Sequence, residues 1–206
     1  CEQTGLIVPL GAWILERAAT QLRDWHASHS ALKDLCISVN LSGRQVADPQ
    51  LLRTLERVLS DTGLDPSRLK LEITESVLMD HLEVALRTMH SIREMGIRLS
   101  IDDFGTGYSS LSHLHRFPID YLKVDRSFVQ PLGPDTRGWE MVRVIVALAR
   151  NFGMRTIAEG VETQEQADVL RTLGCDFVQG YLHSPPLDPD RALRFVEERL
   201  DRQQDV

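Results

Sequence analysis

Short apolar segments alternate with amphipathic segments along most of this chain. The apolar segments cover residues 35–41, 69–74, 97–103, 121–125, 155–159 and 177–181. Apolar residues recur at helical spacing over residues 10–25, 49–61, 82–95, 111–117, 139–152, 164–173 and 190–200. Short strands that alternate with helices of this length are typical of parallel βα units. The pattern therefore predicts an α/β fold with a parallel sheet.

Glycines mark the ends of several predicted helices. Gly63, Gly96, Gly153 and Gly174 each stand between a helical segment and the next strand, where a left-handed helix cap is expected. No low-complexity or charged linker interrupts the pattern, and 206 residues suit one domain better than two. We therefore expect residues 1–206 to form one domain.

Polar residues stand at or just beyond the carboxyl end of every predicted strand. They are Asn40, Glu72, Asp102, Asp103, Lys123, Glu159, Glu162 and Gln179. In a parallel barrel these ends meet at one mouth, so residues far apart in sequence converge there. Taken singly, Asp102 and Asp103 also fit an ordinary turn, because Asp is common where strands end. The repetition over all six strands favours a functional site.

The chemistry of these residues points to a metal site. Two adjacent carboxylates such as Asp102 and Asp103 repel each other, and a bound cation favours their ionised form. Carboxylate and amide oxygens are ligands that Mg²⁺ and Mn²⁺ prefer over softer metals. The sequence therefore predicts a divalent metal site at the mouth of the sheet.

Composition limits the environment and the partners of the chain. The net charge of −7 argues against binding of a nucleic acid polymer, which requires a basic face. Cys1, Cys36 and Cys175 are odd in number and far apart, which fits a reducing cytoplasm better than a disulfide framework. No apolar run is long enough to span a membrane. We expect a cytoplasmic protein whose present segment does not contact a membrane.

The motifs at the strand ends resemble those of a known family. They are Asn40-Leu41-Ser42, Glu72-Ile73-Thr74-Glu75, Asp102-Asp103-Phe104-Gly105-Thr106-Gly107-Tyr108-Ser109-Ser110, Lys123-Val124-Asp125, Glu159-Gly160-Val161-Glu162 and Gln179-Gly180-Tyr181. This set is similar to that of the EAL-domain cyclic-di-GMP phosphodiesterases. The resemblance implies a modified TIM (β/α)8 barrel that acts in bacterial second-messenger signalling. It implies hydrolysis of one phosphodiester of cyclic di-GMP to linear pGpG, with two Mg²⁺ or Mn²⁺ ions.

The resemblance also assigns roles to individual metal ligands. It makes Asn40, Glu72 and Asp102 ligands of one ion. Asp102 then bridges to a second ion, which Asp103 and Glu159 also hold. Two close metal ions can activate a water, align it with phosphorus and stabilise the leaving oxygen.

Further roles follow from the same resemblance. Lys123 is expected to hold the attacking water, and Glu159 and Glu162 are expected to take part in catalysis. Glu75 is expected to anchor the loop of residues 104–110, which the family places near the metals and the dimer interface. Gln179 and Asp125 are expected to position the substrate or this loop. A homodimer and an upstream sensory or diguanylate-cyclase-type domain are the expected partners besides cyclic di-GMP.

The Glu-Ala-Leu strand that gives the family its name is missing from the 206 residues. In the family its glutamate is a metal ligand, a nearby arginine contacts the substrate, and the strand lies upstream of the segment that resembles residues 2–7. We therefore expect about six of the eight barrel strands here. The barrel should be open with one edge unpaired, and the segment alone is expected to have little activity.

Two other functions fit parts of the sequence. One is a catalytically inactive module that binds cyclic di-GMP, although the retained ligands argue against degeneracy. The other is a TIM-barrel aldolase in which Lys123 forms a Schiff base. That reaction requires a depressed lysine pKa, whereas the surrounding carboxylates should favour the charged form.

Overall fold

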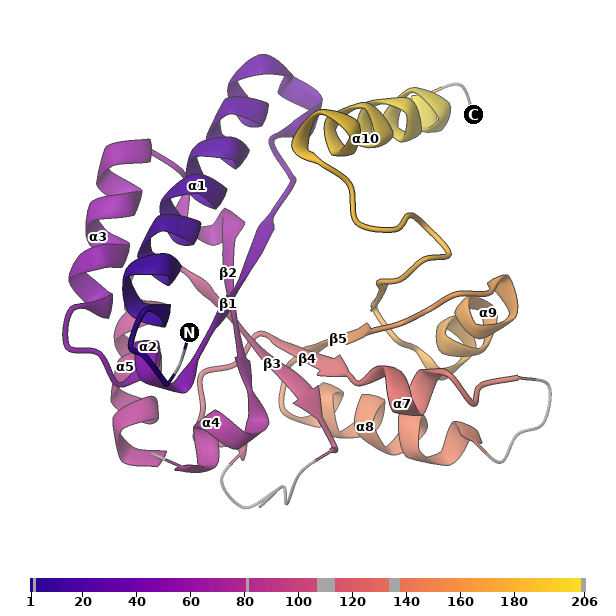
Figure 1. Ribbon diagram of the computed structural model, residues 1–206. Helices are drawn as coiled ribbons and strands as arrows, with labels where there is room; N and C mark the ends of the chain where they lie inside the picture. The colour runs from indigo at the N-terminus through magenta and orange to yellow at the C-terminus, as the bar shows by residue number, and fades with distance from the viewer. Residues whose placement is uncertain (2, 81, 107–113, 134–137, 205–206) are drawn as a thin grey trace.

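The computed structural model describes residues 1–206 except residues 2, 81, 107–113, 134–137, 205 and 206. It contains a six-stranded sheet whose neighbouring strands are all parallel, as the sequence pattern predicts (Figure 1). The strands are β1 (Ile37–Leu41), β2 (Leu69–Thr74), β3 (Arg98–Phe104), β4 (Tyr121–Val124), β5 (Arg155–Ala158) and β6 (Phe177–Val178). Their order in the sheet is their order in the sequence.

Helices precede, connect and follow the strands, and the longer ones before β6 lie on one side of the sheet (Figure 1). They are α1 (Ile7–Ser28), α2 (Gly43–Val46), α3 (Leu51–Thr62), α4 (Glu75–Asp80), α5 (Leu82–Glu94), α7 (Arg126–Val129), α8 (Trp139–Asn151), α9 (Gln164–Leu173) and α10 (Pro189–Gln204). Helix α10 approaches the C-terminal end of α1, where His29 Nε2 lies 2.9 Å from Glu197 Oε1. This arrangement is the βα succession of an incomplete barrel wall.

The element boundaries differ from the predicted ones at several places. Helix α1 begins earlier than expected because Pro9 lies in its first turn, where a missing N–H has no cost. The short helices α2, α4 and α7 follow strand ends directly and were not expected. Residues 111–113 of the predicted helix over residues 111–117 lie outside the described residues, and of the other four only Leu114 is helical. The four glycines predicted to cap helices all have positive φ angles.

The last strand is shorter than the predicted segment 177–181. Strand β6 ends at Val178, and the following backbone bonds to the loop after β5, with Val161 N donating to Gln179 O at 3.1 Å. A Cβ atom at Gly180 would lie 2.2 Å from Val161 O, so only glycine fits there. This close contact bends the chain away from the sheet.

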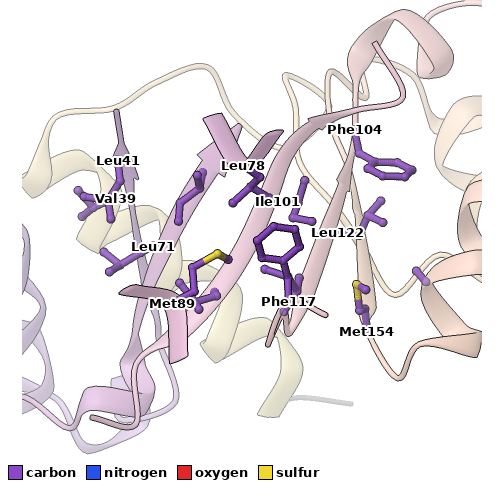
Figure 2. Packing of buried hydrophobic residues seen from close by; sticks show 14 of the residues in the cluster. Val39, Leu41, Leu71, Leu78, Met89, Ile101, Phe104, Phe117, Leu122 and Met154 are labelled. Carbon is purple, nitrogen blue, oxygen red and sulfur yellow. The ribbon is translucent and has the colours of Figure 1, made fainter. Parts of the chain in front are cut away.

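The hydrophobic core lies between the sheet and the helices. Strands β1 to β4 each direct apolar side chains toward the helical layer. Examples are Val39, Leu71, Ile101 and Leu122, which pack there among other buried side chains (Figure 2). Each such side chain contributes about 1.5–3 kcal/mol when fully buried. Packing of this core fixes how neighbouring strands are aligned, and therefore how far each strand end extends toward the mouth of the sheet.

The opposite face of the sheet carries polar side chains. Strand β2 alternates Leu69, Leu71 and Ile73 with Lys70 and Glu72, so its polar residues share the inner face of the barrel wall. The Cα partners along the sheet place Asn40 beside Glu72 and Thr74 beside Asp102. The polar residues therefore form layers inside the barrel wall.

The sheet is open, as expected, but it has two free edges rather than one. Strand β1 pairs only with β2, and β6 pairs only with β5, within the described residues. An edge strand presents unpaired backbone groups that can accept further strands. Within the same residues, no helix has the length and apolar character that a membrane span requires.

Candidate active site

The site is centred on the ammonium group of Lys123. Its side chain comes from β4, is 4% exposed, and points toward carboxylates from three other segments. Lys123 Nζ lies 2.7 Å from Glu72 Oε2 of β2 and 2.7 Å from Glu159 Oε1, which follows β5. Asp102 Oδ1 of β3 is 3.0 Å away. Four strand ends thus meet at one charged cluster.

Burial and charge pairing shift the pKa of these groups. Burial by itself lowers the pKa of Lys123, but hydrogen bonds to Glu159 and Glu72 more than offset it, so the pKa lies well above its ordinary value. Burial raises the pKa of Glu159, and the charges of Asp102 and Glu72 add to this effect against the opposing influence of Lys123. Lys123 is therefore protonated, and negative charge at the cluster exceeds what it can neutralise.

A bulge in β3 explains how two adjacent carboxylates reach one site. Between Ile101 and Phe104, strand β3 has one residue more than β4, so Asp102 and Asp103 lie opposite Lys123. Among the described residues, Asp103 is the only non-glycine with a positive φ, at 54°. Neighbouring strand residues normally point to opposite faces, and a bulge changes this direction. Both carboxylates can therefore serve the same site.

Asp102, Asp103 and Glu159 form a donor set that suits a hard divalent cation. One carboxylate oxygen from each lies within 4.8 Å of the others. Burial and the charges of Asp102 and Asp125 raise the pKa of Asp103 above its ordinary value. A cation bound among these oxygens would relieve the repulsion, and oxygen ligands of this kind suit Mg²⁺ or Mn²⁺. The residues present therefore fit a divalent metal ion.

The other predicted site residues lie on neighbouring elements and do not contact Lys123 within the described residues. Asn40 is exposed on β1 beside Glu72, and within the described part of the chain it forms no hydrogen bond with Lys123. Asp125 caps α7 by accepting a hydrogen bond from Ser127 N at 2.9 Å. Glu162 and Gln179 are exposed and line the cavity beside Glu159. None of these four belongs to the three-carboxylate metal set.

Glu75 connects the end of β2 to the loop after β3. It begins α4, is buried, and its Oε2 accepts a hydrogen bond from Gly105 N at 3.1 Å. Residues 107–110 of the predicted anchored loop lie outside the described residues. The described part shows that Glu75 holds the first residue after β3, next to Asp102 and Asp103.

Replacing Glu75 with alanine is expected to reduce turnover about tenfold or more while metal binding is retained. The charge-assisted bond to Gly105 N is lost, and the carboxylates of the β3 bulge lose part of their support. Glu75→Gln is the matched control because it can still accept this bond. Metal titration and steady-state kinetics measure the two effects separately. Unchanged turnover in Glu75→Ala would reject the anchoring role.

A cavity of about 580 Å³ adjoins the cluster on the side of β5 and β6. Besides predicted site residues, it is lined by Arg126, Gln130 and Tyr181, which the sequence analysis did not assign to the site. Arg126 directly follows Asp125, the last residue of one strand-end motif, and Tyr181 is itself the last residue of another. Their place at the ends of these motifs is the signal that could have identified them.

Comparison with known proteins gives one consistent result. The family description "EAL domain" matches residues 1–186. The chain is 42% identical over 195 residues to the bifunctional diguanylate cyclase/cyclic di-GMP phosphodiesterase MucR of Pseudomonas aeruginosa, covering 95% of this chain and 28% of that protein. It is 41% identical over 187 residues to the cyclic di-GMP phosphodiesterase NbdA of the same organism, covering 90% and 24%.

Solved structures agree with these matches. The PaMucR phosphodiesterase in complex with c-di-GMP superposes with a TM-score of 0.87 at 42% identity, covering 93% of this chain and 76% of that one. The EAL domain of Mycobacterium smegmatis DcpA gives a TM-score of 0.88 at 35% identity, covering 94% and 86%. The chain spans about a quarter of the length of the curated relatives it matches.

Proposed function

This chain belongs to the EAL domain family, and we propose that it forms the catalytic core of a phosphodiesterase that hydrolyses one phosphodiester of cyclic di-GMP to linear pGpG. The observation that carries the proposal is the cluster in which Lys123 contacts Glu72, Asp102 and Glu159. The fold is that of the EAL domains, which are modified TIM barrels. Relatives named as cyclic di-GMP phosphodiesterases support the substrate.

We place two Mg²⁺ or Mn²⁺ ions at the cluster. Asn40, Glu72 and Asp102 would hold one ion, and Asp102, Asp103 and Glu159 would hold the other. The second of these sites is supported by the carboxylate oxygens of Asp102, Asp103 and Glu159, which lie within 4.8 Å of one another. When bound, such ions lower the pKa of a water and stabilise negative charge on the reacting phosphate. Asp102 is the ligand that the two ions share.

Lys123 holds and orients the attacking water in this scheme. Its ammonium group is fixed by Glu72 and Glu159 at 2.7 Å each, and its raised pKa keeps all its protons as donors. Glu159 Oε1 lies 2.7 Å from Lys123 Nζ, so its carboxylate is close to the water that Lys123 orients and takes part in catalysis there. Glu162 lines the adjoining cavity, where it faces the substrate. It is the third catalytic residue of the scheme, after Lys123 and Glu159.

Lys123 is unsuited to Schiff-base chemistry. An aldolase lysine requires a neutral amine, and hence a depressed pKa. Here the hydrogen bonds to Glu159 and Glu72 outweigh burial and raise the pKa. The geometry therefore favours a water-holding ammonium group over a nucleophilic amine.

The remaining expectations on partners are part of the proposal. A homodimer is supported by Met141 and Val144, which expose apolar surface along α8, and by the exposed Phe152 just after its last residue. Helix α8 also reaches the loop after β3, since a Cβ atom at Gly105 would lie 3.6 Å from Ile145 Cδ1. An upstream sensory or cyclase-type domain is supported by the greater length of the relatives. The proposed homodimer and the proposed upstream domain fit an enzyme that acts in cytoplasmic signalling.

The decisive experiment compares residues 1–206 with a protein extended upstream to include a Glu-Ala-Leu strand. The extended protein is expected to release pGpG from cyclic di-GMP with Mg²⁺ or Mn²⁺, because the strand adds a carboxylate to the first metal site and pairs an open edge. Residues 1–206 alone are expected to be at least about 100-fold slower, given the loss of a charged metal ligand.

A Glu-to-Ala change in the added tripeptide is the matched control, and it should abolish the gain. Product formation is followed by chromatography. No pGpG from the extended protein would refute the proposed activity. Equal rates from the two proteins would show that the added glutamate is dispensable and that the metal assignment is wrong.

A further inference from the structure

The inner face of the sheet carries a buried hydroxyl group to which hydrolysis assigns no role. Ser100 of β3 is 0% exposed, and its Oγ forms no hydrogen bond with any residue that the structure describes. Among those residues it is the only buried side-chain oxygen or nitrogen atom without a partner. Buried polar groups are nearly always paired, because an unpaired one has lost its hydrogen bonds to water. The neighbours of Ser100 in the sheet show which group can become its partner.

Strand pairing places Ser100 beside Glu72. Leu99 and Ile101, on either side of Ser100, belong to the hydrophobic core, so the Ser100 side chain lies on the opposite, inner face (Figure 2). On the neighbouring strand β2, the Cα partner of Ser100 is Glu72, which also faces inward. Neighbouring strands lie about 4.8 Å apart, a separation that a serine hydroxyl and a glutamate carboxylate can bridge.

The other polar neighbours of Ser100 are paired with one another. Tyr121 of β4 is also a Cα partner of Ser100, and its hydroxyl accepts a hydrogen bond from Arg98 Nη1 at 2.8 Å. Lys70 Nζ lies 4.7 Å from the centre of the Tyr121 ring. Arginine and lysine side chains are donors only, so neither can accept a bond from a hydroxyl. Glu72 is therefore the carboxylate that strand pairing makes available to Ser100.

The carboxylate of Glu72 can accept a further hydrogen bond. Lys123 Nζ donates to Glu72 Oε2 at 2.7 Å, and in the described part of the chain no group donates to Oε1. Carboxylates that bind a metal ion are usually held by a hydrogen bond from a neighbouring group, which fixes the direction of the ligand oxygen. Ser100 is a neighbour whose donor no described residue uses.

We propose that Ser100 is a positioning residue of the metal site, whose hydroxyl donates to Glu72 when that carboxylate serves a divalent ion. This inference rests on the proposed function, since the proposed scheme makes Glu72 a metal ligand. Ser100 contacts neither the ion nor the substrate, and it acts by fixing the carboxylate of Glu72. The unpaired hydroxyl makes the protein without metal less stable, and its pairing makes metal binding tighter.

A purely steric role for Ser100 leads to a different expectation. A residue that is 0% exposed on the inner face must be small, whatever its hydroxyl does. Alanine satisfies this requirement, because it differs from serine only by the missing oxygen. With a steric role, Ser100→Ala would leave metal binding unchanged. With the positioning role, it weakens metal binding although the fold is kept.

The test titrates Mn²⁺ into full-length protein that has been freed of metal with a chelator, and follows binding by calorimetry. The wild-type protein is expected to bind two ions. Ser100→Ala should bind one of them about tenfold more weakly, as loss of support to a metal ligand implies, and the other as the wild-type protein does. Without metal, Ser100→Ala should unfold at the same or a higher denaturant concentration than the wild-type protein, because the unpaired hydroxyl is gone.

A double-mutant comparison shows whether Ser100 acts through Glu72. Glu72→Ala retains only the second ion in the proposed scheme, because Glu72 is a ligand of the first. Adding Ser100→Ala to this protein should leave the affinity for the remaining ion unchanged, since the supported carboxylate is absent. A further tenfold loss of affinity would show that Ser100 acts on another ligand, and it would overturn the inference.

Ser38→Ala is the matched control, because Ser38 is an exposed serine on the inner face of β1 whose Cα partner is Lys70. It should bind Mn²⁺ and unfold as the wild-type protein does. The inference is overturned if Ser100→Ala binds both ions with wild-type affinity, or if it unfolds more easily than the wild-type protein without metal. A wild-type protein that binds two ions without releasing pGpG would refute only the proposed hydrolysis. A wild-type protein that binds no Mn²⁺ would refute the metal site and the role of Ser100 together.

Discussion

Replacing Lys123 with methionine is expected to lower the free energy of unfolding of the metal-free protein by about 3 kcal/mol, because it leaves buried carboxylates without their cation. Glu72 and Glu159 each lose a 2.7 Å contact to Nζ, and both lie close to Asp102. Added Mn²⁺ should recover part of this loss by supplying positive charge to the same oxygens. Turnover of cyclic di-GMP should fall at least about 100-fold, since the water loses its donor.

Denaturant unfolding with and without Mn²⁺ measures the first effect, and pGpG release by the full-length protein measures the second. Lys33→Met is the matched control, because Lys33 is exposed and remote from the cluster. It should change neither quantity. A Lys123→Met protein that unfolds like the wild-type protein, or that keeps its turnover, would contradict the central place given to this ammonium group.

Asp102→Asn is expected to remove both metal ions and to reduce turnover about 1,000-fold or more, as loss of several kcal/mol of charge stabilisation implies. Asp102 lies within 4.8 Å of the oxygens of Asp103 and Glu159, and 3.0 Å from Lys123 Nζ. In the proposed scheme it is the carboxylate that serves both ions. Elemental analysis of the dialysed protein gives the metal content, and kinetics give the turnover.

Two comparisons make this prediction specific. Asp103→Asn should lose only one ion, because its carboxylate belongs to the second site alone in the proposed scheme. Asp168→Asn, on the exposed surface of α9, should retain both ions. The shared-ligand assignment fails if Asp102→Asn keeps either ion with normal affinity, or if Asp103→Asn loses both.

Much of the fold follows from local patterns. The alternation of Leu71 and Ile73 with Lys70 and Glu72 identifies one strand and its two faces, because side chains in a strand repeat every two residues. Glycines with positive φ, such as Gly63 and Gly174, mark helix ends because other residues avoid that conformation. Parallel order then places the polar strand ends at one mouth. These signals lie within a few residues of one another, so the sequence displays them directly.

The assembly of the site depends on contacts between distant residues. Glu72 and Lys123 are separated by 51 positions, and their 2.7 Å contact depends on the register between strands. The bulge that directs both Asp102 and Asp103 to the site arises from a shift in pairing between β3 and β4. Neither feature has a local signature, because strand pairing is determined by packing across the whole sheet.

The sequence by itself therefore determined the parallel α/β class, the succession of strands and helices along the chain and the set of polar residues at the strand ends. Only the tertiary structure decided which three carboxylates contact Lys123, that β6 ends at Val178, and that Arg126 reaches the cavity beside Glu159. The physical reason is the separation along the chain over which each effect acts. Periodicity and turn preferences act between near neighbours, whereas charge pairing, bulges and cavity walls depend on which strands and loops the packed core brings together.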